Sequence, residues 1–268
     1  MAESTDVRRD ADVEADTVLE ARDLTKKFGE VVANDAISLS VKRGEMRSII
    51  GPNGAGKTTF FNLITGVLAP TDGTVHFKGE DVTGVSIEDR AQRGLGRSYQ
   101  SNELFFDRTA FENVRIAAQT AELGSFSFDV FSRADTMKRD RAEALIERLS
   151  LTDERNTKAR NLSHGDQRRL GIAISLATDP DLLLLDEPTS GMGPEATDET
   201  AELIRTIGDE LGISIVLIEH DMSVVMGISD RISVLYNGEH IATGTPEEIR
   251  GNEDVQDAYL GGLKEGIE

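Results

Sequence analysis

Residues 51–59, GPNGAGKTT, are the part of the sequence whose types and spacing point most directly to chemistry. They match the pattern GxxxxGK[ST], and they stand between a strand-like apolar segment and a helical one, as that pattern requires. The glycines allow backbone N–H groups to close around phosphate oxygens at the positive end of a helix. Lys57 can reach the β- and γ-phosphates, and the Thr58 hydroxyl can ligate Mg²⁺. The motif therefore predicts a site for a nucleoside triphosphate and Mg²⁺, formed by Gly51, Pro52, Asn53, Gly54, Ala55, Gly56, Lys57, Thr58 and Thr59.

An acidic pair supplies the second half of this chemistry. The run LLLL at 182–185 predicts a buried strand, and Asp186 and Glu187 follow at its end. Beside a phosphate loop, Asp186 would belong to the Mg²⁺ shell and Glu187 would orient an attacking water. Adjacent acids at a strand end also serve as helix caps, which is the alternative. His220 ends the next strand, ISIVLIEH, and can reach a γ-phosphate from the same sheet edge, although a single histidine there is also compatible with a structural role.

Hydrophobic periodicity predicts the elements that position these residues. Apolar and polar residues alternate over 18–41, which predicts an antiparallel β lobe. MRSII at 46–50 predicts a buried strand, and a helix is expected over about 57–65, closed by Gly66. Helical periodicity between about 88 and 178 predicts a separate, mostly helical lobe.

The second half of the chain predicts a parallel sheet and a compact ending. The strands that end at Glu187 and His220 enclose a helix expected over about 195–210, the βαβ order of a parallel sheet. RISVLYNGEHIA at 231–242 predicts a hairpin that turns at Asn–Gly. A terminal helix is then expected to begin with an N-cap, a first-position proline and a capping-box acid, at Thr245, Pro246 and Glu248.

Composition limits the class of protein. Residues 1–17 are acidic and lack periodicity, which predicts a disordered tail; residues 18–245 are expected to form one α/β domain, with 246–268 as a helical extension. Cysteine is absent, which excludes disulfides and thiolate metal sites. No apolar stretch approaches the roughly 20 residues of a spanning helix. The first residues also lack the apolar core of a secretory signal, so the chain is expected in the cytosol.

The net charge is −20, and only 8 of the 29 basic residues are lysines. This balance argues against nucleic acid as the main partner, because neutralising phosphates requires clustered cations. An acid excess spread over the whole chain suggests a cytosol of very high salt, in which screening removes the self-repulsion. An ordinary acidic protein is the alternative.

The motifs, in this order, resemble the nucleotide-binding subunits of ABC transporters over about residues 18–260. Besides the phosphate loop and LLLLDE, the resemblance includes Gln100 in RSYQ at the Q-loop, LSHGD at 162–166 at the signature, and His220 as the switch histidine. Phe28 stands where the family stacks an aromatic ring on adenine. The resemblance implies an α/β P-loop NTPase fold with a mixed central sheet, an antiparallel β lobe and a helical lobe.

The resemblance also implies ATP hydrolysis by two such subunits, identical or different, that face head to tail. Each ATP would lie between the phosphate loop of one subunit and Ser163 and Gly165 of the other. The implied partners are two transmembrane permease subunits and, indirectly, an extracellular solute-binding protein, but no nucleic acid. The chain would then be peripheral at the cytoplasmic face of the membrane. The residues implied in hydrolysis are Glu187, Gln100 and His220, and those implied in holding Mg²⁺ are Thr58, Gln100 and Asp186.

Within the family, four segments are similar to the importer subunit for branched-chain amino acids: the Q-loop surroundings GLGRSYQSNELFFDRTAFENV, the insert with GSFSFDVFSRA, EHDMSVVMGISDRI and the ending GTPEEIRGNEDVQDAYLG. Importers of urea or amides and exporters of lipid share much of this pattern and are alternatives. Soluble ABC ATPases of ribosomes or DNA repair are a further alternative, but they typically fuse two nucleotide domains or insert long coiled coils. The signature, Q-loop and switch histidine argue against a P-loop kinase, and the intact Glu187 argues against a regulator without turnover.

Two positions depart from the commonest family pattern. The signature LSGGQ is replaced by LSHGD, and Gly193 in SGMGP stands where the D-loop usually has an aspartate that reaches the opposite site. Ser163 and Asp166 also fit a capping box at the start of a helix. A carboxylate aimed at ATP would repel its phosphates. Asp166 is therefore expected to fold back onto the backbone as a cap, while Ser163 faces the nucleotide across the dimer.

Overall fold

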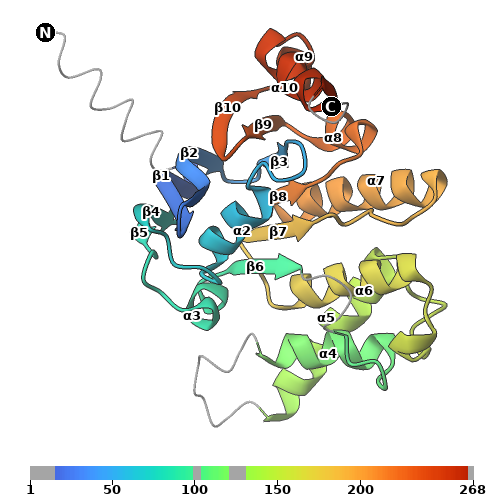
Figure 1. Cartoon of the computed structure of the whole chain (residues 1–268). Coiled ribbons are helices and arrows are strands. Elements are labelled where there is room, and N and C mark those ends of the chain that lie inside the picture. Colours follow the sequence, from blue (N-terminus) through green and yellow to red (C-terminus); the bar gives the residue numbers. More distant parts are fainter. Residues whose placement is uncertain (1–15, 99–103, 121–130, 265–268) are drawn as a thin grey trace, which may run out of the picture.

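A six-stranded, mostly parallel sheet lies at the centre of the computed structural model, which describes residues 16–98, 104–120 and 131–264 (Figure 1). The strand order is β10-β9-β3-β8-β7-β6, and all neighbours are parallel except the antiparallel pair of β9 and β10. Every residue of β3 and β8 is buried, as expected for apolar strands covered on both faces. The strands are β3 (Met46–Ile50), β6 (Leu95–Ser98), β7 (Leu182–Asp186), β8 (Ser214–Ile218), β9 (Arg231–Tyr236) and β10 (Glu239–Gly244).

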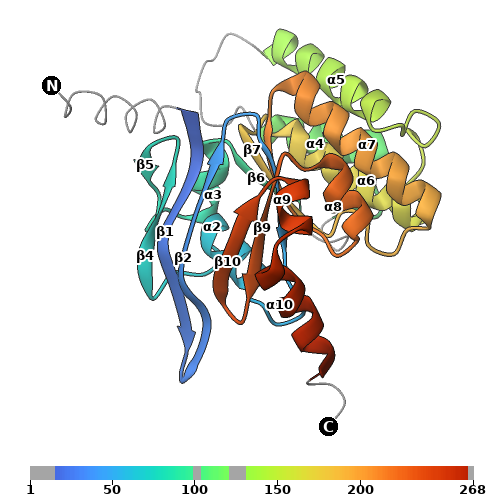
Figure 2. The same ribbon diagram turned by 90° about the horizontal axis from the view of Figure 1, so that it is seen from above.

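A second sheet is antiparallel, with the order β2-β1-β4-β5. Leu24 of this sheet packs in one buried cluster with Phe60 and Phe61 of α2 (Lys57–Thr65) and with Leu184 of β7, so α2 lies between the two sheets (Figure 2). This arrangement confirms the predicted β lobe and mixed central sheet. The strands are β1 (Thr17–Phe28), β2 (Val31–Lys42), β4 (Asp72–Phe77) and β5 (Glu80–Asp81).

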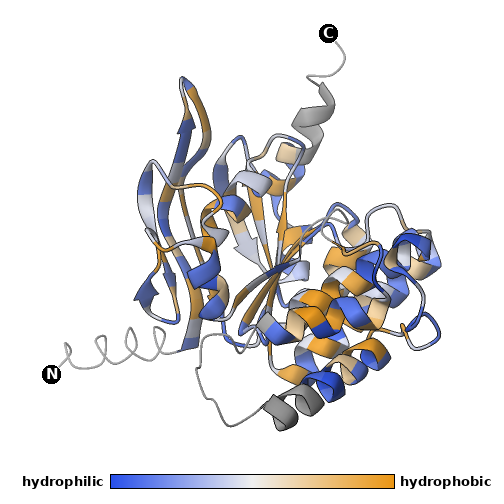
Figure 3. Cartoon of the chain, turned by 90° about the horizontal axis from the view of Figure 1, so that it is seen from below, coloured by the Kyte–Doolittle hydropathy of each residue, from blue (hydrophilic) through white to orange (hydrophobic). Residues whose placement is uncertain are grey.

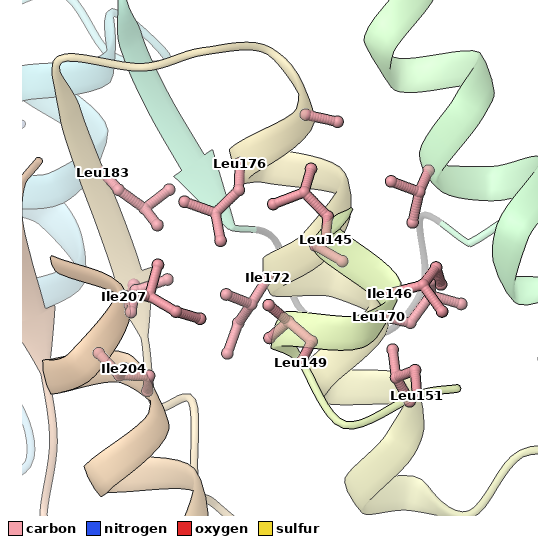
Figure 4. Close-up of a cluster of buried hydrophobic side chains, with 14 of the residues drawn as sticks. Leu145, Ile146, Leu149, Leu151, Leu170, Ile172, Leu176, Leu183, Ile204 and Ile207 are labelled. Carbon is pink, nitrogen blue, oxygen red and sulfur yellow. The ribbon is translucent and has the colours of Figure 1, made fainter. Parts of the chain in front are cut away.

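Three long helices pack on one another in a lobe beside β7, and a fourth contributes to the same buried cluster. Hydrophobic residues (orange) gather where these helices face one another, and hydrophilic residues (blue) lie toward the outside (Figure 3). Leu145 of one helix, Leu149 just after its end, Ile172 of the next helix and Ile204 of another are buried in a single cluster that also reaches Leu183 of β7 (Figure 4). The helices are α4 (Ala110–Thr120), α5 (Phe131–Arg148), α6 (His164–Ala177) and α7 (Pro194–Leu211).

One strand, β6, falls inside the range 88–178 for which the sequence predicts helix. It follows a short helix, α3 (Ile87–Gln92), and pairs in parallel with β7 from Leu95 to Ser98. Its sequence, LGRS, contains a single large apolar residue, so periodicity gives no strand signal. Pairing with the buried strand β7 overrides the local pattern. A Cβ on Gly96 would lie 3.0 Å from the Pro180 Cβ, so glycine is what lets this edge pack closely.

The C-terminal part has the elements predicted for it. The hairpin of β9 and β10 turns at Asn237 and Gly238, both with positive φ, which is typical of a type I′ turn. At Thr245 both hydrogen bonds of a capping box with Glu248 are present. Ile249 of the following helix packs against the sheet in a third buried cluster. The remaining helices are η2 (Ala159–Asn161), α8 (Met222–Ile228), α9 (Pro246–Arg250) and α10 (Glu253–Lys264).

The predicted tail lies almost wholly outside the described residues, since these begin at residue 16 and β1 begins at Thr17. The tail and the division of the chain into tail, domain and extension therefore stay predictions. Over the part of the chain that the structure describes, no helix combines the length and apolar character needed to cross a membrane.

Candidate active site

The loop that joins β3 to α2 forms a cradle of backbone N–H groups. At Gly51 a Cβ would lie 2.1 Å from the Leu235 carbonyl oxygen, and at Gly56 it would lie 2.5 Å from the Ala33 carbonyl oxygen. Neither position can therefore carry a side chain, and Gly56 also has φ +94°. The first turn of α2 has no side-chain cap, because its N-cap is Gly56. Its N–H groups and the positive end of the helix dipole are thus directed at whatever the loop encloses.

Lys57 places its ammonium group inside this loop. Its side chain is only 6% exposed, and Nζ donates to the carbonyl oxygens of Gly51 at 2.6 Å and Pro52 at 3.0 Å. Burial lowers the pKa of Lys57, while the nearby carboxylates of Glu187 and Asp186 act in the opposite direction. The lysine that the sequence assigns to phosphate binding therefore lies beside the acidic pair that it assigns to hydrolysis. Among the other loop residues, Asn53, Gly54 and Thr58 are exposed, Pro52 and Thr59 are half-buried, and Ala55 is buried.

Asp186 ends β7 in a nearly buried position. Its Oδ2 accepts from Arg97 Nη2 at 3.4 Å. The Asp186 side chain is 9% exposed and the Arg97 side chain 10%. Burial raises the pKa of Asp186, and the guanidinium of Arg97 partly offsets this rise. Arg97 Nη1 also donates to Asn62 Oδ1 at 2.7 Å, which connects β6, α2 and β7. Sequence reasoning missed Arg97 because it lies on the unpredicted strand β6.

Glu187 has an unusual backbone. Its φ is +49°, in the left-handed region that non-glycine residues seldom occupy. Three hydrogen bonds fix this conformation. The Glu187 N–H donates to the Ile218 carbonyl at 2.9 Å, while Arg168 Nη1, at 2.5 Å, and the Ser190 N–H, at 3.2 Å, both donate to the Glu187 carbonyl. Strain of about 1–3 kcal/mol in such a residue is typical of functional sites. Arg168, on α6, carried no signal in the sequence that would have marked it.

Glu187 and His220 face each other across the ends of two adjacent strands. Glu187 Oε1 and His220 Nε2 are 2.9 Å apart, with side-chain exposures of 32% and 45%. Because β3, β8 and β7 are neighbouring parallel strands, their carboxyl ends bring the phosphate loop, His220 and Glu187 to one edge of the sheet. Open α/β sheets bind ligands at this edge. The structure thus brings together the loop, the acidic pair and the histidine that the sequence singled out.

The remaining predicted site residues lie around this edge or outside the described part. Phe28, at the end of β1, is 49% exposed, with Lys26 Nζ 5.2 Å from its ring centroid, so the ring is accessible for stacking. Gln100 lies outside the described residues. Gly193 is the N-cap of α7 and, because it lacks a side chain, forms no capping hydrogen bond there.

The start of α6 corrects one detail of the sequence prediction. Ser163 is the N-cap, and its Oγ accepts from the Asp166 N–H at 3.1 Å. Asp166 folds back as expected, but onto the Ser163 hydroxyl, which donates to Asp166 Oδ2 at 2.6 Å, and not onto the backbone N–H. Aspartate is one methylene shorter than the Glu248 that completes the box at Thr245. Ser163 is exposed, and a Cβ on half-buried Gly165 would meet only the Ser163 Oγ, at 3.8 Å.

The described residues at this edge do not by themselves form a metal site. Among the residues with described placement, no group of three or more histidines, aspartates and glutamates is clustered for a metal ion. A cation here would therefore depend on one carboxylate, a hydroxyl and oxygens of a bound ligand, which is the usual situation for Mg²⁺ with a nucleotide.

Family models match two parts of the chain. Residues 34–190 match a model described as ABC transporter, and residues 239–263 match one described as branched-chain amino acid ATP-binding cassette transporter. The first spans the phosphate loop, the signature region and the acidic pair. The second spans β10, α9 and most of α10.

Curated relatives are similar over nearly the whole chain. The high-affinity branched-chain amino acid transport ATP-binding protein LivG of Salmonella typhimurium is 44% identical over 249 residues, which cover 91% of this chain and 98% of LivG. BraF of Pseudomonas aeruginosa, which has the same description, is 41% identical over 250 residues, with coverage of 91% and 98%. The lipopolysaccharide export system ATP-binding protein LptB of Acidithiobacillus ferridurans is 33% identical over 244 residues, with coverage of 91% and 97%.

Two solved structures similar to this chain are ATP-binding cassettes. A nucleotide-free cassette from an ABC transporter has a TM-score of 0.78 at 28% identity, covering 91% of this chain and 98% of that one. A dimeric cassette in a post-hydrolysis state, bound to ADP and Pi, has a TM-score of 0.73 at 28% identity, covering 85% and 98%.

Proposed function

The chain belongs to the ABC transporter family of ATPases, and from that premise we propose that it energises the import of branched-chain amino acids. The match of residues 239–263 to the branched-chain amino acid model supports this solute class, as do the names of LivG and BraF. That match covers the ordered ending built from β10, α9 and α10, which lies outside the nucleotide site.

The arrangement of the phosphate loop beside the Glu187–His220 pair is the observation that carries the assignment of roles. In this assignment the loop from Gly51 to Thr59 binds the phosphates of ATP and Phe28 stacks on adenine. Glu187 accepts a proton from the attacking water, and His220 and Gln100 contact the γ-phosphate. The hydrogen bond from His220 to Glu187 keeps the carboxylate directed at the sheet edge where the γ-phosphate would lie.

Mg²⁺ fits the donors at this site. Thr58 and Asp186, together with Gln100, are hard oxygen donors, and Mg²⁺ is usually held by one or two carboxylates plus nucleotide phosphates. Burial raises the pKa of Asp186, so a divalent cation would offset the loss of solvation of its carboxylate. When bound, the ion would neutralise charge on the β- and γ-phosphates.

A dimer of two such subunits would complete two nucleotide sites. Ser163 and Gly165, at the exposed N-terminus of α6, would contact the γ-phosphate of ATP bound to a second ATPase subunit, identical or paralogous. In the isolated subunit the single proton of the Ser163 hydroxyl is donated to Asp166 Oδ2, so contact of this hydroxyl with the phosphate would require that hydrogen bond to open. Further partners would be two permease subunits and, through them, an extracellular solute-binding protein, with this chain peripheral at the cytoplasmic face of the membrane.

The acid excess supports a further proposal, that the protein works in a cytosol of high salt. With a net charge of −20, mutual repulsion destabilises the compact state at low ionic strength and is screened at high ionic strength.

Deletion of the gene tests the proposed solute. Uptake of radiolabelled leucine, urea and a short aliphatic amide would be measured in the deletion strain. The strain would then be complemented with the wild type or with Lys57→Ala, which lacks the ammonium group in the phosphate loop. We expect leucine uptake to be lost, restored by the wild type and not restored by Lys57→Ala. Loss of urea or amide uptake alone would assign one of the alternative importers, and loss of none would contradict import of these solutes.

A further inference from the structure

One buried carboxylate, Glu219, joins the loops that follow β7 and β8. Its side chain is 3% exposed. Oε1 accepts from the Thr189 N–H at 2.9 Å and from the Thr189 hydroxyl at 2.6 Å, and Oε2 accepts from the His220 N–H at 3.1 Å. Three donors from two loops therefore converge on one side chain, and hydrogen bonds to a carboxylate are about twice as strong as neutral ones.

These bonds enclose the reactive pair. Thr189 is two residues after Glu187, and His220 directly follows Glu219, while the side chains of Glu187 and His220 are 2.9 Å apart. These four residues and Pro188 thus form a closed ring of covalent and hydrogen bonds. Because the Glu187 and His220 side chains are 32% and 45% exposed, packing alone does not fix them. Their relative position depends on the backbones that carry them, and Glu219 ties those backbones together.

We propose that Glu219 is a positioning residue for ATP hydrolysis. It sets the spacing between His220 and Glu187 by holding the loop after β7 against the loop after β8. This inference rests on the hydrolytic role proposed for Glu187. The structure does not direct Glu219 toward the nucleotide edge, since both of its oxygens are occupied by backbone and hydroxyl donors.

The variant Glu219→Gln tests the role with little change of volume. The amide keeps one oxygen acceptor, but its NH₂ group must then face either the His220 N–H or the Thr189 donors, so at least one bond is lost and two donors oppose each other. We expect kcat for ATP hydrolysis to fall about 10-fold with the KM for ATP changed less than about twofold, because the phosphate loop is untouched. Substitution of a buried residue that does not position the Glu187–His220 pair would lower the melting temperature without a fall in kcat at nearly constant KM.

A second pair of variants tests the same link from the other side. Thr189→Val removes the hydroxyl donor while keeping the shape of the side chain, and Thr189→Ser keeps the hydroxyl. We expect Thr189→Val to lower kcat about threefold and Thr189→Ser to restore it, since positioning within about 0.5 Å governs rate. These variants keep the proposal testable if Glu219→Gln folds poorly.

Glu45→Gln is the matched control. Glu45 is 7% exposed and accepts from Arg47 Nε at 2.6 Å and from the Lys42 N–H at 2.9 Å, but it precedes β3, at the end of that strand opposite the phosphate loop. We expect Glu45→Gln to lower the melting temperature and leave kcat unchanged when both are assayed well below that temperature.

The outcomes distinguish the positioning role of Glu219 from the role of Glu187 as the base. If Glu219→Gln or Thr189→Val, folded and assayed well below its melting temperature, retains kcat within twofold of the wild type, Glu219 is not a positioning residue. Glu187→Gln, measured in parallel, tests the proposed base itself: full turnover in that variant contradicts the role of Glu187 whatever the result at Glu219.

Discussion

At the scale of single residues, Glu187 combines a strained backbone with a partly exposed carboxylate. Its φ of +49° is held by hydrogen bonds from three different segments, so the direction of its side chain is set before any ligand binds. Asp186, the adjacent residue, is in the opposite environment, because it is nearly buried and paired with Arg97. Two neighbouring acids thus have different surroundings, which suits a metal ligand and a base.

Glu187→Gln should separate binding from turnover. The amide retains the size of the side chain and its contact with His220 but cannot accept a proton from water. We expect turnover at least about 100-fold below the wild type with ATP affinity nearly unchanged. Phosphate release and equilibrium binding of a fluorescent ATP analogue measure the two quantities. Wild-type turnover in a folded, ATP-binding variant would show that another group acts as the base.

His240, on β10, should make stability depend on pH. Burial lowers its pKa, Arg47 lowers it further, and a hydrogen bond with the Ala242 carbonyl acts in the opposite direction. The native state therefore resists a proton that the unfolded chain takes up below the ordinary value of 6.5, so stability is lost as the pH falls through that value. We expect the melting temperature to fall more steeply between about pH 7.5 and pH 5.5 in the wild type than in His240→Gln. If the melting temperature depends on pH equally in the two proteins, His240 does not cause this pH dependence.

At the scale of elements, the start of α6 serves two purposes. Ser163 caps the helix through the Asp166 N–H, and the same turn carries this exposed serine and a half-buried glycine. Among the residues that the structure describes, none requires glycine at position 165, since an added Cβ meets only the Ser163 Oγ at 3.8 Å. A position without a side chain is compatible with the phosphate proposed to approach from the partner.

Gly165→Ala tests this separation between folding and function. Alanine in a helix is favoured over glycine by up to about 1 kcal/mol, so we expect the isolated subunit to become slightly more stable. We expect turnover to fall at least about 10-fold, because the methyl group would occupy space next to the γ-phosphate. Chemical denaturation and steady-state ATPase assays measure the two effects. An equally active variant would exclude close approach of the phosphate to Gly165.

The sequence predicted elements well wherever local signals were strong, and missed those that depend on tertiary pairing. The phosphate loop, helix α2 and the Thr245 cap follow from residue types at fixed spacing, and each is present. Strand β6 has almost no apolar pattern and forms because β7 is beside it. Arg97 and Arg168 act through contacts with distant segments, so no window of sequence could identify them.

At the scale of the whole molecule, net charge outweighs individual ion pairs. Exposed pairs such as Arg160–Asp107, with side chains 54% and 80% exposed, contribute about 0–1 kcal/mol each and are weakened by salt. The excess of 20 negative charges acts over the entire surface, and its repulsion decreases as salt shortens the Debye length from about 10 Å at 0.1 M to about 3 Å at 1 M. The net effect of salt should therefore be stabilising.

We expect the melting temperature to rise by about 4 °C or more from low salt to about 2 M KCl, equivalent to roughly 1–2 kcal/mol for a chain of this size. Thermal scans in KCl measure this rise. Sucrose at the same osmolality is the control, because it stabilises by exclusion from the surface and does not screen charge. A flat response to KCl, or an equal response to sucrose, would contradict adaptation to a saline cytosol.

The backbone of Glu187 has a consequence for how this protein can change over generations. Glycine adopts a φ of +49° without strain, so the replacement that best suits the chain at this position is the one that removes the carboxylate. With Glu187 as the proposed base, selection for stability alone would favour an inactive subunit, and selection for turnover would retain the glutamate. Among duplicated copies of such a gene, a glycine at this position would identify a subunit that retains the fold but no longer hydrolyses ATP.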